Sequence, residues 1–300
     1  GIFDTYRLYE LPEWRDFLTS LGASIHPAWH FGILDRDQFA LGVSATCDII
    51  RGSSDPDPMW VSELQGGPNI YSVDRALGPT KEDIAQWVWT GVGAGAEKVI
   101  FWCLNWRRKG GEAGEWTMLN YRGEPSERLL EASEIANMIS EEANFFAEAA
   151  PVEIGVTVVL SQESMDIGLR KDRWESAVPG RKTRAHIQSS LAWYEALSEG
   201  GLPAQFKEMK DYDWEDARNA VAILANAIAI PEAVYARIER FVENGNTLVL
   251  SGLSGYFNEH EVNVFQTKFG LERVLGARVE EVKRVKPAFD LSMSDPHLLL

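Results

Sequence analysis

The sequence predicts an α/β protein made of two successive units of parallel strands and helices. In both halves of the chain, short apolar runs alternate with segments of helical apolar spacing, which is the pattern of parallel β/α units. Pro151 marks the boundary between the halves, because a continuous apolar strand follows it. A length of 300 residues and a hydrophobic content of 45% suit two domains with sizeable cores.

The first unit is expected to contain three strands, each followed by a helix. Pro12 stands at the start of a helix within the mixed segment 1–20, and residues 52–58 form a loop. Thr80 and Asp83 make a capping box for a helix that ends near Gly93. The expected strands lie within 18–29, 58–63 and 98–104, the first running into a loop with His26, Trp29 and His30, and the expected helices lie at 36–50, 80–93 and 125–150.

The second unit is expected to be an open, doubly wound sheet. Its predicted strands are 152–161, 204–210, 220–230 and 246–252, and its predicted helices are 184–200 and 231–244. A G-x-G-x-x-G fingerprint is absent, so we expect no nucleotide. Ser251 and Ser254 follow a strand, but no G-x-S-x-G elbow surrounds them. This unit is therefore predicted to be non-catalytic.

The composition excludes several classes of partner. A net charge of −16 argues against nucleic acids and anionic membranes. No run approaches the ~20 apolar residues of a membrane span. Cys47 and Cys103 are too few for a disulfide scaffold or a four-cysteine zinc site, and we expect both to be buried thiols. The 11 Trp residues fit either a Trp-rich core or the aromatic faces of a sugar cleft.

The stretch 58–67, PMWVSELQGG, carries the clearest chemical signal. A short apolar run leads to Glu63 and Gln65, and a Gly-Gly turn follows, so Glu63 is expected near the carboxyl end of a buried strand. Barrel enzymes keep their catalytic groups at that end of the sheet. A carboxylate at a strand end can equally be an ordinary surface group.

Five segments together carry a family resemblance: HPAWHF (26–31), ATCDIIRG (45–52), MWVSELQGGPNIYS (59–72), WVWTGVGAGAEKVIFWCLNWR (87–107) and GGEAGEWTMLNYRGEPSER (110–128). Over residues 15–140 the chain resembles the β-galactosidases of glycoside hydrolase family 42, and residues 150–280 are similar, more loosely, to the family's second domain. The resemblance implies the last units of a TIM (β/α)8 barrel at 1–148, a flavodoxin-like doubly wound α/β domain of the trimerisation type at 149–285, and the start of a further segment at 286–300.

The resemblance implies a retaining hydrolase of terminal β-D-galactosides in oligosaccharides, with no cofactor and no metal. Glu63 matches the nucleophile that forms the galactosyl–enzyme intermediate. Glu115 matches a carboxylate that binds galactose hydroxyls, although Met118 stands where some members have a His. Asn105 and Trp106 lie at the end of the matching eighth strand and are expected to bind substrate. Trp29 and His30, on a loop at the same end of the sheet, are expected to line the cleft.

The family's acid/base lies in an Asn-Glu pair before the fifth strand. The pair Asn258–Glu259 falls instead in the second unit, so we expect the acid/base outside this chain. By the match, Gly1 lies near the end of the fifth strand. We therefore expect an inactive fragment of a protein that is a homotrimer in full-length form. No signal peptide is visible, which slightly favours a cytoplasmic location.

Alternatives stay open at this point. The chain could be a non-catalytic carbohydrate-binding or assembly protein that uses the same cleft, or a related glycosidase such as an α-L-arabinopyranosidase. Glu115 could be a solvated loop residue. His26 and His30 have the i, i+4 spacing of metal ligands, but no third ligand accompanies them.

Overall fold

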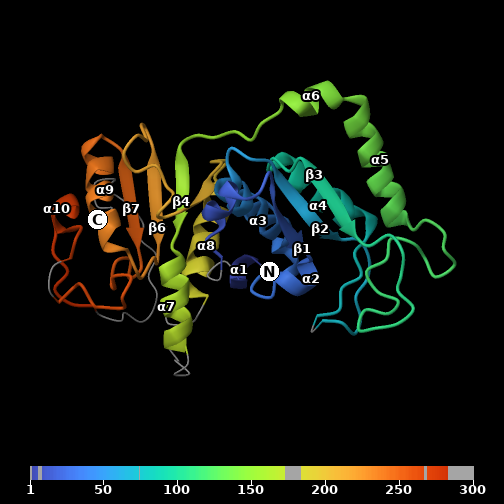
Figure 1. Ribbon diagram of the computed structural model, residues 1–300, viewed down its shortest axis with the longest axis horizontal. Helices are drawn as coiled ribbons and strands as arrows, with labels where there is room; N and C mark the ends of the chain where they lie inside the picture. Colours follow the sequence, from blue (N-terminus) through green and yellow to red (C-terminus); the bar gives the residue numbers. More distant parts are fainter. Residues whose placement is uncertain (1, 6–8, 74, 173–183, 267–268, 283–300) are drawn as a thin grey trace.

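The computed structural model describes residues 2–5, 9–73, 75–172, 184–266 and 269–282 of the chain. They form two separate parallel sheets, each packed against helices (Figure 1). The α/β class and the two parallel sheets are thereby confirmed, and the domain boundaries stay predictions. The expected segment 286–300 lies outside the described residues.

The first sheet has three parallel strands in chain order: β1 (Leu21–Ile25), β2 (Met59–Gln65) and β3 (Lys98–Trp102). Helices α3 (Phe39–Ser54) and α4 (Lys81–Gly93) connect them, and α4 packs on α5 (Glu127–Glu141). Val61 and Leu64 of β2 are buried at 1% exposure in the core against these helices. Ile100 of β3 is 49% exposed, so the helices leave part of this sheet uncovered. That the sheet belongs to an eight-stranded barrel stays a prediction.

The second sheet has the order β5-β4-β6-β7, with all neighbours parallel. Neighbouring residues of β4 point to opposite faces: Val158 packs into the core that contains α8, and Val159 into the core that contains α9. The sheet is therefore buried on both faces, as the doubly wound prediction requires. Its strands are β4 (Val156–Leu160), β5 (Gln205–Glu208), β6 (Val221–Ala225) and β7 (Thr247–Ser251), and its helices are α7 (Gln162–Asp172), α8 (Ala185–Glu199), α9 (Glu232–Glu243) and α10 (Glu272–Leu275).

Helix α3 joins the two units by packing directly on β5. Gly52 makes this approach possible, because a Cβ at its position would lie 3.0 Å from the Phe206 carbonyl carbon and closer still to its oxygen. Tyr194 of α8 reaches across to donate to the buried carboxylate of Asp48, and its hydroxyl lies 2.8 Å from Ser44 Oγ. One continuous hydrophobic core contains residues of both units.

The structure corrects several local predictions. The segment after β1 is a short helix, α2 (Pro27–His30), because Pro27 favours the first helical position. Helix α3 runs through Ser54 and so shortens the predicted loop 52–58, and the hydroxyls of Ser53 and Ser54 bond to carbonyls one turn back. The predicted helix 125–150 is two helices, α5 and α6 (Ala143–Glu148), broken at Glu142.

Three further outcomes concern features outside these boundaries. The capping box of Thr80 and Asp83 is present, with each side chain bonded to the other's backbone amide. Cys47 is buried as predicted, but Cys103 is only half-buried, so the prediction of a second buried thiol was wrong. Among the described residues no helix has both the length and the apolarity needed to cross a membrane. The minor elements are α1 (Ile2–Thr5), η2 (Leu11–Asp16) and η3 (Arg36–Gln38).

Candidate active site

The candidate site lies at the carboxyl end of the first sheet, where the three parallel strands end together. Helix α2 follows β1, and long loops follow β2 and β3, on the same side of the sheet (Figure 1). Parallel strands bring the residues after their carboxyl ends to one edge, which is where α/β proteins bind ligands. The predicted residues Glu63, Trp29, His30, Asn105, Trp106 and Glu115 all belong to this edge or its loops.

Glu63 stands at an irregularity in β2. The register of β1 with β2 shifts between Ala23 and Ser24, so that Ser24 pairs with Glu63. The side chain of Glu63 is 43% exposed. The hydroxyl of Ser24 donates to Glu63 Oε2 at 2.7 Å, and His26 Nε2 lies 3.5 Å from the same oxygen. The structure thus presents a carboxylate that is open to solvent and held on one oxygen, as a nucleophile would need to be.

His26 lies beneath this carboxylate and is 3% exposed. Its ring packs edge-on against Trp116 at a centroid distance of 5.0 Å and against Trp29 at 6.4 Å. Burial lowers the pKa of His26 to about 4, although the carboxylate of Glu63 works in the opposite direction. The imidazole is therefore uncharged at neutral pH.

Trp29 and His30 share the short helix α2. The Trp29 ring is 59% exposed and lies 5.3 Å from the His30 ring. The backbone amide of His26 donates to His30 Nδ1 at 3.2 Å, and burial lowers the pKa of His30 to about 3. No group of three or more potential metal ligands occurs in the part of the chain that the structure describes. Because Trp29 is largely exposed, its ring can offer an aromatic face to a ligand. The His30 ring is instead fixed by the hydrogen bond from the His26 amide.

Glu115 is buried at 3% exposure and binds the loop that follows β2. Its Oε1 accepts the amide of Tyr71 at 2.7 Å, and its Oε2 accepts the amide of Ser72 at 3.3 Å and also the Ser72 hydroxyl. Burial raises the pKa of Glu115, but the hydrogen bonds from Ser72, Tyr71 and Ile70 outweigh it and hold the pKa below its usual range. Glu115 is therefore an ionised anchor of this loop.

The anchored loop presents a residue that sequence reasoning did not single out. Tyr71 is 90% exposed, although both of its neighbours are fixed through Glu115 or the loop backbone. An exposed aromatic side chain on a fixed backbone is suited to stacking on a sugar. Its place in the segment GGPNIYS, eight residues beyond Glu63, was the available signal.

A strained residue connects the loops that follow β2 and β3. Trp116 has a φ of 65°, a conformation that bulky residues rarely adopt. Its amide donates to Pro68 O at 2.8 Å, and its carbonyl accepts the amide of Cys103 at 2.8 Å. Gln65, buried at 0% exposure, adds a link by accepting the amide of Ala28 at 3.2 Å. These bonds fix the Trp116 ring against His26.

The residues after β3 lie farther out. Asn105 is exposed and Trp106 is half-buried, and the guanidinium of Arg108 lies 5.8 Å from the Trp106 ring. Arg107 covers Trp102 at 4.6 Å and pairs with Glu112 at 3.1 Å. No hydrogen bond or ring contact joins Asn105 or Trp106 to Glu63 among the described residues. His26 contacts Glu63, Trp29 and His30, and so brings these three residues together. Asn105 and Trp106 lie in the loop after β3, at the rim of this group.

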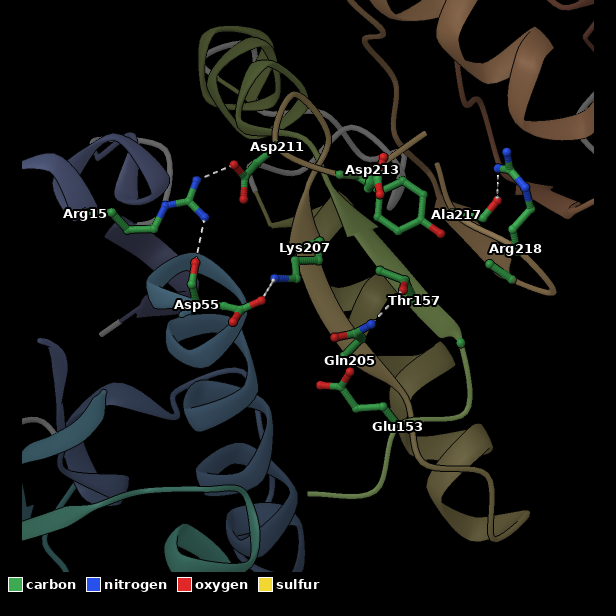
Figure 2. A pocket seen from close by; sticks show the side chains of 13 residues that line it. Arg15, Asp55, Glu153, Thr157, Gln205, Lys207, Asp211, Asp213, Ala217 and Arg218 are labelled. Carbon is green, nitrogen blue, oxygen red and sulfur yellow. Dashed lines mark hydrogen bonds and ion pairs between the residues drawn. The ribbon is translucent and has the colours of Figure 1, made fainter. Parts of the chain in front are cut away.

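A polar cavity of about 450 Å³ lies elsewhere, between the two units at the amino end of the second sheet. Figure 2 shows Arg15 and Lys207 facing the acidic residues across it. Arg15 donates to the Asp55 carbonyl at 3.0 Å and pairs with Asp211, and Lys207 pairs with Asp55 at 3.1 Å (Figure 2). These pairs bridge the units, so we interpret the cavity as part of their docking surface.

Residues 156–295 match the sequence profile described as a β-galactosidase trimerisation domain. The chain is also similar to curated β-galactosidases. It is 24% identical over 199 residues to BbgII of Bifidobacterium bifidum, covering 63% of this chain and 27% of that protein. It is 22% identical over 254 residues to BgaP of a Planococcus species, covering 81% of this chain and 34% of that protein.

A solved structure has a similar fold. The β-galactosidase from Bacillus circulans sp. alkalophilus matches with a TM-score of 0.77 at 17% identity, over 95% of this chain and 40% of that one. At this identity the likeness concerns the fold alone. The chain spans about a third of the length of the curated relatives that it matches.

Proposed function

We propose that this chain is part of a glycoside hydrolase family 42 β-galactosidase, as its trimerisation-domain match and its similarity to curated β-galactosidases support. In this proposal Glu63 is the nucleophile of a retaining reaction. The observation that supports the proposal most strongly is the environment of Glu63. The carboxylate stands at the carboxyl end of β2, is half-exposed, and accepts a hydrogen bond from Ser24 on one oxygen. A nucleophile must be ionised and accessible, and a donor to the charged form favours ionisation.

Retaining hydrolysis then proceeds in two steps. A Glu63 oxygen attacks the anomeric carbon as the bond to the leaving oxygen breaks, and a second carboxylic acid protonates that oxygen. Water, deprotonated by the second carboxylate, next displaces Glu63 from the galactosyl–enzyme ester. The two carboxyl groups of retaining glycosidases stand ~5–5.5 Å apart.

The second carboxyl group is not Glu259. Glu259 Oε2 accepts the backbone amide of Glu232 at the start of α9, in the second unit, and Asn258 is buried beside it. By the resemblance, the acid/base of the family lies in an Asn-Glu pair before the fifth strand, which precedes the strands described here. We therefore propose that the acid/base residue lies outside the residues that the structure describes.

The surrounding residues would position the galactoside. Trp29 and Tyr71 offer exposed aromatic faces, and Trp106 and Asn105 lie at the rim. His30 lines the same end of the sheet. Both oxygens of Glu115 already accept donors from the loop 70–72, so any bond from Glu115 to galactose hydroxyls would use its remaining lone pairs. The match of residues 156–295 to a trimerisation domain supports a homotrimer.

A substrate with an excellent leaving group tests this role without an acid/base. The 2,4-dinitrophenyl 2-deoxy-2-fluoro-β-D-galactoside needs no protonation of its leaving group, and the fluorine slows release of the sugar from the enzyme. We expect the protein to release one equivalent of dinitrophenolate as a burst, and the Glu63→Gln variant to release none. An equal burst from both proteins would exclude Glu63 as the nucleophile. No release from either would favour a non-catalytic carbohydrate-binding protein.

A further inference from the structure

His26 is a buried polar side chain whose contacts in the structure are incomplete. It is 3% exposed, and neither ring nitrogen has a hydrogen-bond partner within the described structure. Buried polar atoms are nearly always paired, so an unpaired one calls for an explanation. His26 Nε2 lies 3.5 Å from Glu63 Oε2, which is contact distance but longer than an ordinary hydrogen bond.

The charge on Glu63 decides which nitrogen of His26 carries the proton. A neutral imidazole has one N–H donor and one acceptor nitrogen. An acceptor nitrogen facing an ionised carboxylate would set two lone pairs against each other. The form with the proton on Nε2 instead points a donor at Glu63 Oε2. It leaves Nδ1, which has no hydrogen-bond partner among the described residues, as the unprotonated nitrogen.

We propose that His26, held uncharged with its proton on Nε2, is a positioning residue for Glu63 and binds Oε2 together with Ser24 so that Oε1 is the oxygen that attacks. This inference rests on the proposed function of Glu63. Both contacts that the described residues make with this carboxylate fall on Oε2. Catalytic hydrogen bonds are often long in a ligand-free enzyme and shorten when substrate binds.

An uncharged imidazole at His26 suits a nucleophilic Glu63 better than a cationic one. Ser24 and His26 both come from β1 or the residue directly after it, so one strand supplies both donors. A cationic imidazole would pair with Glu63 and make its oxygens poorer nucleophiles. A neutral one still stabilises the carboxylate and, after attack, donates to the carbonyl oxygen of the ester. The titratable groups in contact with His26 are Glu63 from β2 and His30 from α2, and the loop after β3 contributes the uncharged Trp116.

A purely structural role for His26 is the rival explanation, because its ring packs between aromatic neighbours. Two substitutions separate the roles. His26→Phe keeps an aromatic ring in the same space and removes the donor, whereas His26→Gln loses the ring and can place an amide N–H near the position of Nε2. A structural role predicts that Phe is the better replacement, and a positioning role predicts that Gln is.

The first readout is the rate of labelling by the dinitrophenyl fluorogalactoside. We expect His26→Phe to slow labelling roughly ten- to a hundred-fold, since a hydrogen bond to a charged group is lost. His26→Gln should recover most of the rate. His260→Phe, the same change at an exposed histidine of the second unit, serves as the matched control and should label at the unsubstituted rate.

The second readout is independent of catalysis. Long-range ¹H–¹⁵N spectra of the unsubstituted protein at pH 7 should show His26 with its proton on Nε2, and Glu63→Ala should weaken that preference. A proton on Nδ1, a cationic ring, or a spectrum unchanged by Glu63→Ala would overturn the inference. So would labelling of His26→Phe at the unsubstituted rate. If the unsubstituted protein takes up no label, the proposed function fails, and the spectra still decide the pairing of His26 with Glu63.

Discussion

Substitution of Gly52 by Ala tests how the two units are joined. In most helices this change stabilises the protein by ~1 kcal/mol, since glycine costs more conformational entropy. At Gly52 the added methyl carbon would lie 3.0 Å from the carbonyl carbon of Phe206 and inside contact distance of its oxygen. The obstacle is the backbone of β5, which cannot rotate away as a side chain could. We therefore expect a loss near the upper end of overpacking costs, about 3 kcal/mol.

Urea-induced unfolding followed by tryptophan fluorescence measures this loss. Gly93→Ala is the matched control, because Gly93 is also helical and nothing lies within 4 Å of a Cβ at its position. It should gain ~0.5–1 kcal/mol in the free energy of unfolding. The two variants should thus move in opposite directions. If Gly52→Ala were as stable as the unsubstituted protein, the close packing of α3 on β5 would be wrong.

Two further stability predictions concern buried ionisable groups. Tyr194→Phe removes the hydroxyl that donates to Asp48, which is 5% exposed, and should lower the free energy of unfolding by ~1.5–3 kcal/mol in thermal or urea unfolding. The control Tyr121→Phe, at a residue 69% exposed, should lower it by less than ~0.5 kcal/mol. Equal effects of the two substitutions would contradict the importance of the Asp48 contact. Burial, and next the nearby Glu163, raise the pKa of Glu208 from 4.5 to about 7. The folded state therefore binds a proton that the unfolded state has lost, so the stability this group contributes is complete below pH 4.5 and falls as the pH rises to about 7. Glu208→Gln should flatten the stability profile in that window, and an unchanged slope would show that Glu208 titrates normally.

Local pattern was enough to predict most of the fold. The apolar runs that became β2, β6 and β7 were found because buried parallel strands have little polar interruption. The Thr80–Asp83 capping box was visible because its two residues are three apart in the sequence. Helix α7 was missed, because its segment QESMDIGLRKD is largely polar and only tertiary contacts bury Met165 and Ile167.

Only part of the candidate site could be predicted from the sequence, because its contacts join residues that are far apart along the chain. Glu63 could be proposed as the nucleophile from its place at a strand end together with the family motif around it. Its pairing with Ser24 depends on a register shift that no local pattern reveals. Likewise the bonds of Glu115 to the loop at Tyr71 and Ser72 span more than 40 residues of sequence. The alternative that Glu115 is a solvated loop residue was wrong, because the fold buries its side chain at 3% exposure.

The position of the covalent label tests the central claim most directly. The protein is treated with the dinitrophenyl fluorogalactoside, digested, and mapped by tandem mass spectrometry. We expect the fluorogalactosyl mass on Glu63, within the peptide that carries β2. A label on any other carboxylate, with Glu63 unmodified, would contradict the assignment of Glu63 as the nucleophile.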